Sequence, residues 1–264
     1  MYPCKPTPTP KYCVLIQYIE PESLGKTILH PCTLPHTPAS MSTPYSPPCT
    51  LPLIMYLDDD LLIVDKPAGL LSVPGRGEDK QDCLLSRLRQ DFPEILAVHR
   101  LDMATSGLLV LARHADMHRA LSRLFENRQV DKQYRAVVDG LPGDDCGRID
   151  LPLICDWPNR PRQMVDFTIG KPSLTYFRVL ERDAAQRCSL LELTPITGRS
   201  HQLRVHLASL GHPILGDDLY GGLTFDRAPR LLLHAAAIGF DHPTRGERIE
   251  IVSAAPFDCQ TVAP

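Results

Sequence analysis

The chain has 264 residues, enough for one large or two small domains, and its 43% hydrophobic and 22% charged residues are typical of a globular protein. No segment approaches the ~18 consecutive apolar residues that a membrane span needs, and Val14–Ile16 is too short for a signal-peptide core, so we expect a cytoplasmic protein. A net charge of −3 argues against a surface devoted to nucleic acid, and RNA binding would need a local basic cluster.

The nine cysteines are scattered, odd in number and without a CxxC pair. This pattern favours free thiols over a disulfide framework or a zinc site. The phosphate-binding motifs GxGxxG and GxxxxGK[ST] are also absent. We therefore expect no metal and no nucleotide cofactor.

Residues 1–52 differ in composition from the rest of the chain. They hold 12 of the 26 prolines, four of the nine cysteines and only five charged residues. Because proline fixes φ and removes a backbone donor, this composition predicts disorder or loose extended structure up to Pro52. Met41 offers a second start, and we hypothesise that residues 1–40 are an over-extended reading of the gene. Detection of peptides from this segment in the native protein would contradict the hypothesis.

From Leu53 onward, short apolar runs recur with the lengths and residue types of strands. The predicted strands cover residues 61–67, 108–113, 134–140, 175–182, 188–196, 231–240 and 248–253. The chain shows no internal repeat and no strict alternation of strand and helix. It therefore does not resemble a parallel nucleotide-binding fold.

Three helices are expected among these strands. Apolar residues recur at helical spacing over Cys83–Phe92 and Asp116–Val130, and a third helix is expected from Gly198 to a natural stop at Gly211. Many strands with few, irregularly placed helices predict an α+β fold with a mixed, mainly antiparallel sheet. The predicted boundaries are a single catalytic domain at residues 53–258 and a flexible C-terminus at residues 259–264.

The segment HRLDMATSGLLVLAR (His99–Arg113) places two opposite charges before an apolar run. A carboxylate such as Asp102 at the edge of a core is costly unless it is paired or hydrogen-bonded. On local grounds Asp102 is a turn aspartate paired with Arg100, which lies on the same side of an extended segment. The functional alternative is a nucleophile or general base held by another cation, with Arg100 left for a substrate.

The segment TGRSHQLRVH (Thr197–His206) contains candidates for that other cation. On a helix, His201 and Arg204 are i,i+3 neighbours and share a face. An arginine near a helix N-terminus opposes the helix dipole, which indicates a phosphate contact for Arg199, although simple solvation also explains it. The spacing of His201 and His206 does not put both rings on one helical face, and HExxH is absent, so the histidines are not expected to bind metal.

Tyr134 stands between Lys132 and Arg135. An aromatic ring flanked by cations can stack on a nucleobase while the cations hold phosphates, and the alternative is an ordinary strand tyrosine. Residues 100–135 hold seven Lys or Arg against four acids, and residues 156–163 (DWPNRPRQ) add two arginines and the single tryptophan. Many of these charges belong to solvated faces, but enough remain for a local basic groove.

Three of these motifs, HRLDMATSG, KQYRA and TGRSHQLRVH, resemble in sequence and order the catalytic core of RNA pseudouridine synthases of the RluA type. The resemblance extends through LLIVDKPAGLLSVPGR, LPLICDWPNRPRQ, GHPILGD and RLLLHA, from Leu53 to Phe257. It implies the pseudouridine synthase fold and the isomerisation of specific uridines in structured RNA, which requires no cofactor. Other branches carry an N-terminal S4 RNA-binding module, for which residues 1–52 are too short and too weakly charged.

The resemblance also implies a role for each matching residue. Asp102 takes the position of the essential carboxylate, which either attacks C1′ of the ribose or removes the 2′ proton. Tyr134 takes the position that packs against the target uracil, and Arg204 the position that pairs with the aspartate. Arg100 matches the arginine that enters the base stack when the uridine is flipped out. The remaining substrate-binding positions are a phosphate contact, an apolar wall and a histidine beside the paired arginine: Arg199, Leu203 and His201.

The partners implied by this resemblance are 23S rRNA and tRNA stem-loops, with uridine 746 of the rRNA and uridine 32 of the tRNA as targets. Apart from the resemblance, we expect a monomer. Two alternatives keep the scaffold: the same reaction on another rRNA or tRNA uridine, and a non-catalytic RNA-binding module. A binder has no need of a carboxylate facing phosphates. A third alternative, a metal-dependent hydrolase built on residues 58–60 and Asp102, competes with a solvated turn before a strand.

Overall fold

A computed structural model describes residues 45–262, which belong to one compact unit. The predictions of disorder and of a misplaced start for residues 1–44 lie outside this range. Residues 45–52 form no helix or strand, but they contact the domain. The Tyr45 hydroxyl accepts the Leu71 N–H at 3.1 Å and donates to the Asp82 carbonyl at 2.9 Å.

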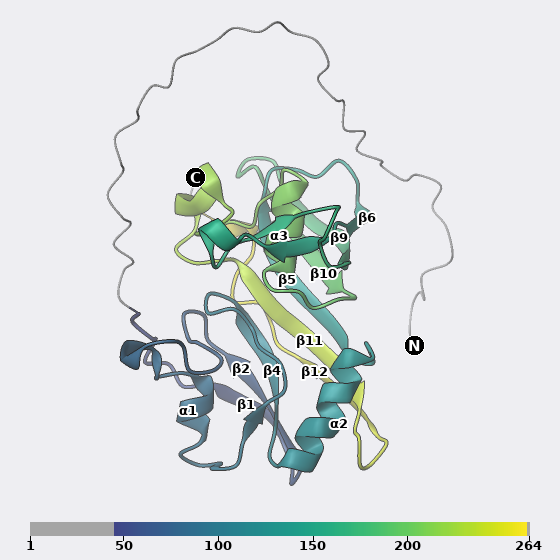
Figure 1. Ribbon diagram of the computed structural model, residues 1–264. Coiled ribbons are helices and arrows are strands. Elements are labelled where there is room, and N and C mark those ends of the chain that lie inside the picture. The colour runs from purple at the N-terminus through teal and green to yellow at the C-terminus, as the bar shows by residue number, and fades with distance from the viewer. Residues whose placement is uncertain (1–44, 263–264) are drawn as a thin grey trace, which may run out of the picture. The chain divides into compact units, whose positions relative to one another are not determined.

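A ten-stranded sheet runs in the order β1-β2-β4-β11-β5-β10-β9-β6, with β3 paired to β4 and β12 paired to β11 (Figure 1). Its strands are β1 (Leu53–Leu57), β2 (Leu61–Lys66), β3 (Leu96–Ala97), β4 (Ser106–Ala112), β5 (Asp131–Asp139), β6 (Cys146–Asp150), β9 (Leu174–Asp183), β10 (Cys188–Pro195), β11 (Leu233–Asp241) and β12 (Arg248–Val252). Among these strands, only β4 and β11 pair in parallel. This architecture confirms the α+β prediction. A separate hairpin joins β7 (Leu153–Cys155) and β8 (Gln163–Val165).

Three α-helices are present in the described residues: α1 (Leu84–Leu88), α2 (Ala115–Glu126) and α3 (Gln202–Ser209). The 3₁₀ segments are η1 (Glu78–Lys80), η2 (Trp157–Asn159), η3 (Gly222–Arg227) and η4 (Cys259–Thr261). The third helix begins at Gln202, four residues after Gly198. The prediction that Arg199 lies in the first turn of this helix was therefore wrong, because Arg199 precedes the helix. No described helix has both the length and the apolar character needed to cross a membrane.

Helices α1 and α2 cover opposite faces of the β2–β4 pair, in the half drawn lowest in Figure 1. Because side chains alternate along a strand, Leu109 of β4 packs with α1 while Leu108 packs with α2. All seven residues of β4 are therefore buried, as a central strand covered on both faces requires.

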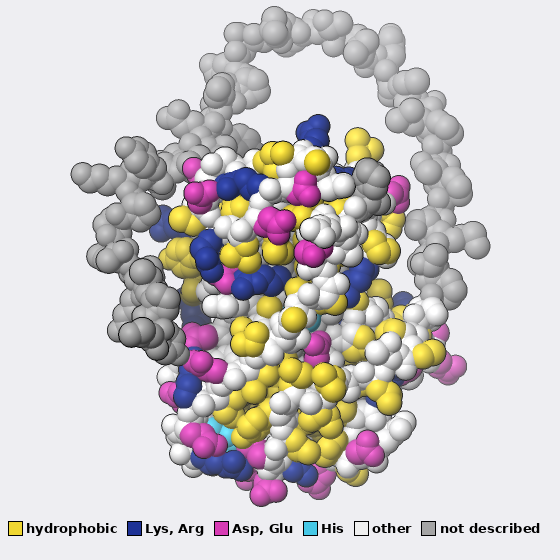
Figure 2. Space-filling model, turned by 180° about the vertical axis from the view of Figure 1, so that it is seen from behind, with side chains coloured by type: hydrophobic (Ala, Val, Ile, Leu, Met, Phe, Trp, Pro, Cys, Tyr) yellow, Lys and Arg dark blue, Asp and Glu magenta, His cyan; other side chains and the backbone are white. Residues whose placement is uncertain are grey.

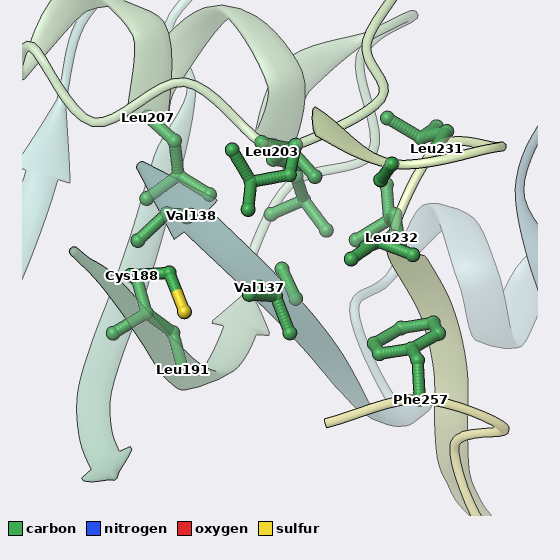
Figure 3. Close-up of a cluster of buried hydrophobic side chains, with 14 of the residues drawn as sticks. Val137, Val138, Cys188, Leu191, Leu203, Leu207, Leu231, Leu232 and Phe257 are labelled. Carbon is green, nitrogen blue, oxygen red and sulfur yellow. The ribbon is translucent and has the colours of Figure 1, made fainter. Parts of the chain in front are cut away.

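The other half of the sheet packs against α3 and the C-terminal segment. Figure 3 shows Leu203 and Leu207 of α3 beside Val137 and Val138 of β5. Phe257 borders the same cluster, which also includes Cys259 and Val262.

Residues 259–262 thus differ from the flexible C-terminus expected from sequence. Cys259 is fully buried and Val262 is 5% exposed, because both complete the apolar cluster against β10. The carboxylate of Asp258 accepts the backbone N–H groups of Gln260 and Thr261, which closes the η4 turn.

The acidic run at residues 58–60 forms the turn between β1 and β2. The Asp58 carboxylate accepts the backbone N–H groups of Asp60 and Leu61 at 2.8 Å each, the geometry of an aspartate-stabilised turn. His242 Nε2 lies 3.0 Å from the same carboxylate. These contacts favour the turn interpretation over a hydrolytic metal site.

Seen from the side opposite to Figure 1, the half of the domain that holds β1 and β12 carries an apolar patch with charged side chains around it (Figure 2). Large exposed hydrophobic side chains in the half that holds β1 and β12 include Leu53, Leu57 and Val252. No catalytic candidate named from the sequence belongs to these edge strands, so the chemistry lies elsewhere in the fold.

Candidate active site

The loop between β3 and β4 holds Asp102 and is fixed by buried hydrogen bonds on both sides. Ser72 donates its hydroxyl to the Leu101 carbonyl at 2.7 Å and accepts the Leu101 N–H at 3.2 Å. The fully buried Lys66 ammonium donates to the Met103 carbonyl at 3.2 Å. The backbone on either side of Asp102 is thus held independently of the Asp102 side chain, which is 32% exposed.

A second buried network lies behind this loop at the start of β4. Arg230 donates to the Ser106 hydroxyl at 2.6 Å, and that hydroxyl is hydrogen-bonded to His234 Nδ1 at 2.9 Å. His234 Nε2 is hydrogen-bonded to the Ser253 hydroxyl at 3.1 Å, and the Ser253 hydroxyl donates to the Asp65 carboxylate. Sequence reasoning gave these residues no role, because they come from β2, β4, β11 and the segments that flank β11 and β12.

A cleft of about 560 Å³ opens beside Asp102. It is bordered by the β3–β4 loop, the C-terminal end of α2, β5 and the segment that leads into α3. The cleft lining includes all seven residues named from the sequence: Arg100, Asp102, Tyr134, Arg199, His201, Leu203 and Arg204. Residues about 100 positions apart in the chain therefore meet around a single carboxylate.

The strongest partner of Arg204 is Asp217 rather than Asp102. Arg204 donates from Nε and Nη2 to the two oxygens of Asp217 at 2.8 and 2.6 Å, and from Nη2 to Asp218 at 2.8 Å. Its Nη1 lies 3.9 Å from Asp102 Oδ2, beyond hydrogen-bonding distance. The expected direct pairing with Asp102 is thus a longer-range contact, because a second acidic residue already satisfies the guanidinium group.

Electrostatics keeps Arg204 charged despite its burial. Burial alone lowers the pKa of the guanidinium group, but the hydrogen bond to Asp217 and the charges of Asp217, Asp102 and Asp218 raise it above its ordinary value. Within residues 45–262, Asp102 lies 3.9 Å from the Arg204 guanidinium group and 3.9 Å from His201 Nε2, and it forms no ion pair with Arg100. The local interpretation, in which Arg100 neutralises Asp102, is therefore replaced by an exposed Arg100 at the cleft rim.

Tyr134 comes from β5, where it is paired with Ala235 of β11 and Leu193 of β10. Its ring packs against the clusters on both sides of the site. Burial, together with the negative charge of Asp102, raises the pKa of the phenol. The side chain is therefore an uncharged aromatic ring beside the carboxylate, and phenolate is strongly disfavoured.

The α2 side of the cleft carries a neutral histidine and two cations. His99 Nε2 accepts the Val110 N–H at 3.0 Å, and its ring stacks on Phe125 with centroids 4.5 Å apart. Burial and the charge of Lys132 lower the pKa of His99 to about 3. Burial and the neighbouring Arg128 in turn lower the pKa of Lys132. An anion bound here would stabilise both cations.

The α3 side contributes an apolar wall and a polar segment. Leu203 is 6% exposed and belongs to the core cluster beneath the cleft. Arg199 is exposed, and its backbone N–H donates to the Gln202 side chain at 3.0 Å. His201 occupies the residue before α3 with a left-handed φ of 53°. The missed residues here are Asp217 and Tyr220, and the two adjacent acids in GDD are the only sequence signal that hinted at a cation partner.

Comparisons with known proteins agree with this arrangement. A family model for RNA pseudouridylate synthase matches residues 60–209. The dual-specificity RNA pseudouridine synthase RluA of Escherichia coli (strain K12) is 50% identical over 206 residues, which cover 78% of this chain and 94% of the relative. RluA of Vibrio vulnificus is 51% identical over 194 residues, covering 72% and 78%.

Solved structures show the same fold. Human RNA Pseudouridylate Synthase Domain Containing 1 superposes with a TM-score of 0.67 at 32% identity, over 81% of this chain and 88% of that chain. Human RNA Pseudouridylate Synthase Domain Containing 4 superposes with a TM-score of 0.61 at 25% identity, over 77% and 88%. The family model thus spans all seven cleft residues named from the sequence.

Proposed function

Because this chain belongs to the RNA pseudouridine synthase family and converts uridine in RNA to pseudouridine, we propose that Asp102 is its essential carboxylate and that its targets lie in 23S rRNA and tRNA stem-loops. The observation that carries the role of Asp102 is its position. It is the carboxylate in the cleft that faces Arg204 and His201 at 3.9 Å while remaining accessible. The targets are supported by the near-complete alignment with relatives described as dual-specificity enzymes.

The reaction is an isomerisation in which atoms and electrons balance without a donor. The bond from ribose C1′ to uracil N1 breaks, the uracil turns, and a bond forms from C1′ to C5. The proton leaves C5 and N1 gains one. Asp102 either attacks C1′ or removes the 2′ proton, and both routes require an ionised carboxylate that the substrate can reach. Arg204 is anchored on Asp217, which leaves the Asp102 oxygens open to the ribose.

The neighbouring residues have separate tasks in this proposal. Tyr134 holds the detached uracil against its ring, a role that an uncharged phenol can fill. Arg100, at the rim, takes the space that the flipped nucleotide leaves in the RNA stack. Lys132 and Arg199 lie on opposite sides of the cleft, where they contact phosphates before and after the target. Leu203 forms the apolar wall.

We also propose that the enzyme acts as a monomer, because a single chain brings Asp102, Tyr134 and Arg204 into one cleft. We propose the cytoplasm, where rRNA and tRNA are modified, as the place of action, and residues 53–258 as the catalytic domain. Size-exclusion chromatography of the 29.4 kDa chain with and without an RNA hairpin tests the monomer. A dimer in both samples would contradict it.

The decisive experiment replaces Asp102 by Asn, which preserves shape and removes the charge. Purified protein is incubated with 23S rRNA fragments and tRNA anticodon stem-loops that carry tritium at uridine C5, and released tritium is counted while pseudouridines are mapped chemically. We expect no release by Asp102→Asn, with RNA binding retained. The exposed Asp59→Asn variant serves as the matched control and should keep full activity. Isomerisation by Asp102→Asn would refute the role of Asp102.

The mapping also separates the two candidate substrate assignments. Pseudouridine at uridines of both RNAs supports dual specificity. Modification confined to some other uridine would overturn the substrate assignment while leaving the reaction and Asp102 intact. Mapping of RNA from a strain that lacks the gene gives the same comparison for native substrates.

A further inference from the structure

Tyr220 contacts the site from outside the cleft. It follows Asp217 in the turn after α3, and its backbone N–H donates to the Asp217 carboxylate at 2.9 Å. Its hydroxyl oxygen accepts the Gln163 N–H from β8 at 2.8 Å and lies 2.8 Å from His201 Nδ1. Because a backbone N–H can only donate, the Tyr220 hydroxyl retains a proton that it can donate to His201 Nδ1.

This contact determines which nitrogen of His201 carries a proton. Burial lowers the pKa of His201, although the charge of Asp102 opposes the effect, so the ring is neutral near pH 7. A neutral imidazole that accepts a hydrogen bond at Nδ1 carries its proton on Nε2. Nε2 is the atom that lies 3.9 Å from Asp102 Oδ1. When Tyr220 donates its proton to Nδ1, the N–H group of His201 is therefore directed toward the carboxylate.

The backbone at His201 also indicates a functional constraint. Its φ of 53° lies in the left-handed region, which is unfavourable for a residue with a side chain. Residues held in such conformations cluster at active sites, where the surrounding structure enforces them. The His201 ring meets the Tyr220 ring edge-on, with centroids 5.7 Å apart, and thus stands between Tyr220 and Asp102.

We propose that Tyr220 is a positioning residue that acts through His201: the Tyr220 O–H fixes Nδ1 as the acceptor, so that His201 Nε2–H is directed at Asp102. This inference rests on the proposed role of Asp102. The Nε2–Oδ1 distance exceeds that of a hydrogen bond in the free protein, and the contact closes when RNA fills the cleft. One oxygen of Asp102 is then oriented by His201, and the other is left for the ribose.

The first test reads the tautomer directly. Two-bond ¹H–¹⁵N spectra of the full chain labelled with ¹⁵N-histidine, with His201 assigned from the His201→Gln variant, are expected to show an Nε2–H imidazole at neutral pH. In Tyr220→Phe, the donor to Nδ1 is lost, and the spectrum should move toward a mixture with the Nδ1–H form. A wild-type Nδ1–H signal, or an unchanged signal in Tyr220→Phe, would overturn the proposal.

The second test is kinetic. In Tyr220→Phe, kcat for tritium release should fall about tenfold, while KM for the RNA stays within about twofold. The phenyl ring still packs against Arg204 and Arg162, whose guanidinium carbons lie 5.2 and 5.3 Å from its centre. Tyr45→Phe is the matched control. Like the Tyr220 hydroxyl, the Tyr45 hydroxyl accepts a backbone N–H, but it donates to a carbonyl away from the cleft. The control should leave kcat and the His201 signal unchanged.

A pair of variants at His201 keeps the proposal testable if Tyr220→Phe folds poorly. In His201→Gln, the amide can accept from Tyr220 and still donate to Asp102, whereas His201→Leu can do neither. We expect His201→Gln to retain at least about tenfold more kcat than His201→Leu. Equal loss in both variants would refute the donor role. Failure of the proposed function appears differently, as isomerisation by Asp102→Asn, and leaves the tautomer of His201 unaffected.

Discussion

Replacing Asp217 by Asn should destabilise the protein more than any single exposed charge can. Asp217 is 1% exposed and Arg204 4% exposed, and two hydrogen bonds of 2.8 and 2.6 Å join them. Breaking a buried ion pair by removing one partner costs about 3–5 kcal/mol, because the other charge stays buried. Asn retains the shape and Asp218 still contacts Arg204, so we expect the lower end, about 3 kcal/mol.

Equilibrium unfolding in urea, followed by circular dichroism, measures this loss. With a slope of up to ~3 kcal/mol per molar urea, a loss of ~3 kcal/mol lowers the midpoint by about 1 M or more. The control is Asp116→Asn, which breaks an exposed ion pair with Arg119 in α2 and should cost less than about 1 kcal/mol. A loss below about 1 kcal/mol for Asp217→Asn would refute the conclusion that Asp217 is the partner that neutralises Arg204.

Three further measurements test the parts of the fold that support the site. Burial lowers the pKa of Lys66 to about 7 from 10.5, so the unfolded chain binds the extra proton between these values. The difference in the free energy of unfolding between the wild type and Lys66→Met should then rise with pH from about 7 to 10.5, by up to ~1.4 kcal/mol per pH unit. Below about pH 7 the difference should stay constant, and a difference that is independent of pH throughout would contradict the pKa shift. Gly107→Ala should cost about 3 kcal/mol or more, because φ is +111° and the new Cβ would lie 2.4 Å from the Ala235 carbonyl, whereas Gly143→Ala meets no atom within 4 Å and should be neutral in the same thermal melts. Hydrogen bonds from His114 and Thr244 lower the pKa of Asp60 below 3.8, so the stability advantage of the wild type over Asp60→Asn should be full above that value and disappear as the pH falls through the folded-state pKa, in melts run from about pH 6 to about pH 3.

The sequence predicted the fold well where burial alone decides the structure. The runs that became β2, β4, β5, β10 and β11 are apolar because these strands contribute to the buried clusters. The runs that became β9 and β12 have only one buried position each, and they were predicted from their β-branched and aromatic residues. The strands that went unpredicted, β1, β3, β6, β7 and β8, are short or exposed. Their pairing is set by partners far away in the sequence, which periodicity does not reveal.

The candidate site shows the same division. Asp102, Tyr134 and Arg204 could be named because their motifs resemble those of a known family, and the structure places all three in one cleft. The partners of Arg204 and His201 could not be named. Asp217 and Tyr220 reach them through the turn after α3, and helical spacing reports only contacts within one turn of a helix. Helical spacing also did not reveal that α3 starts at Gln202, because this start depends on the left-handed backbone of His201, which ends the preceding turn.

The anchoring of Arg204 also explains how Asp102, the proposed catalytic carboxylate, can lie beside a buried cation without being blocked by it. A bidentate pair with Asp102 would occupy both of its oxygens, and the reaction needs at least one of them at C1′ or at the 2′ proton. Asp217 instead takes Nε and Nη2 of Arg204 and holds Nη1 at 3.9 Å from Asp102. At that distance the guanidinium group forms no hydrogen bond to Asp102, so both carboxylate oxygens stay free of Arg204. In this proposal, one aspartate fixes the cation, and the other, Asp102, stays accessible to the ribose.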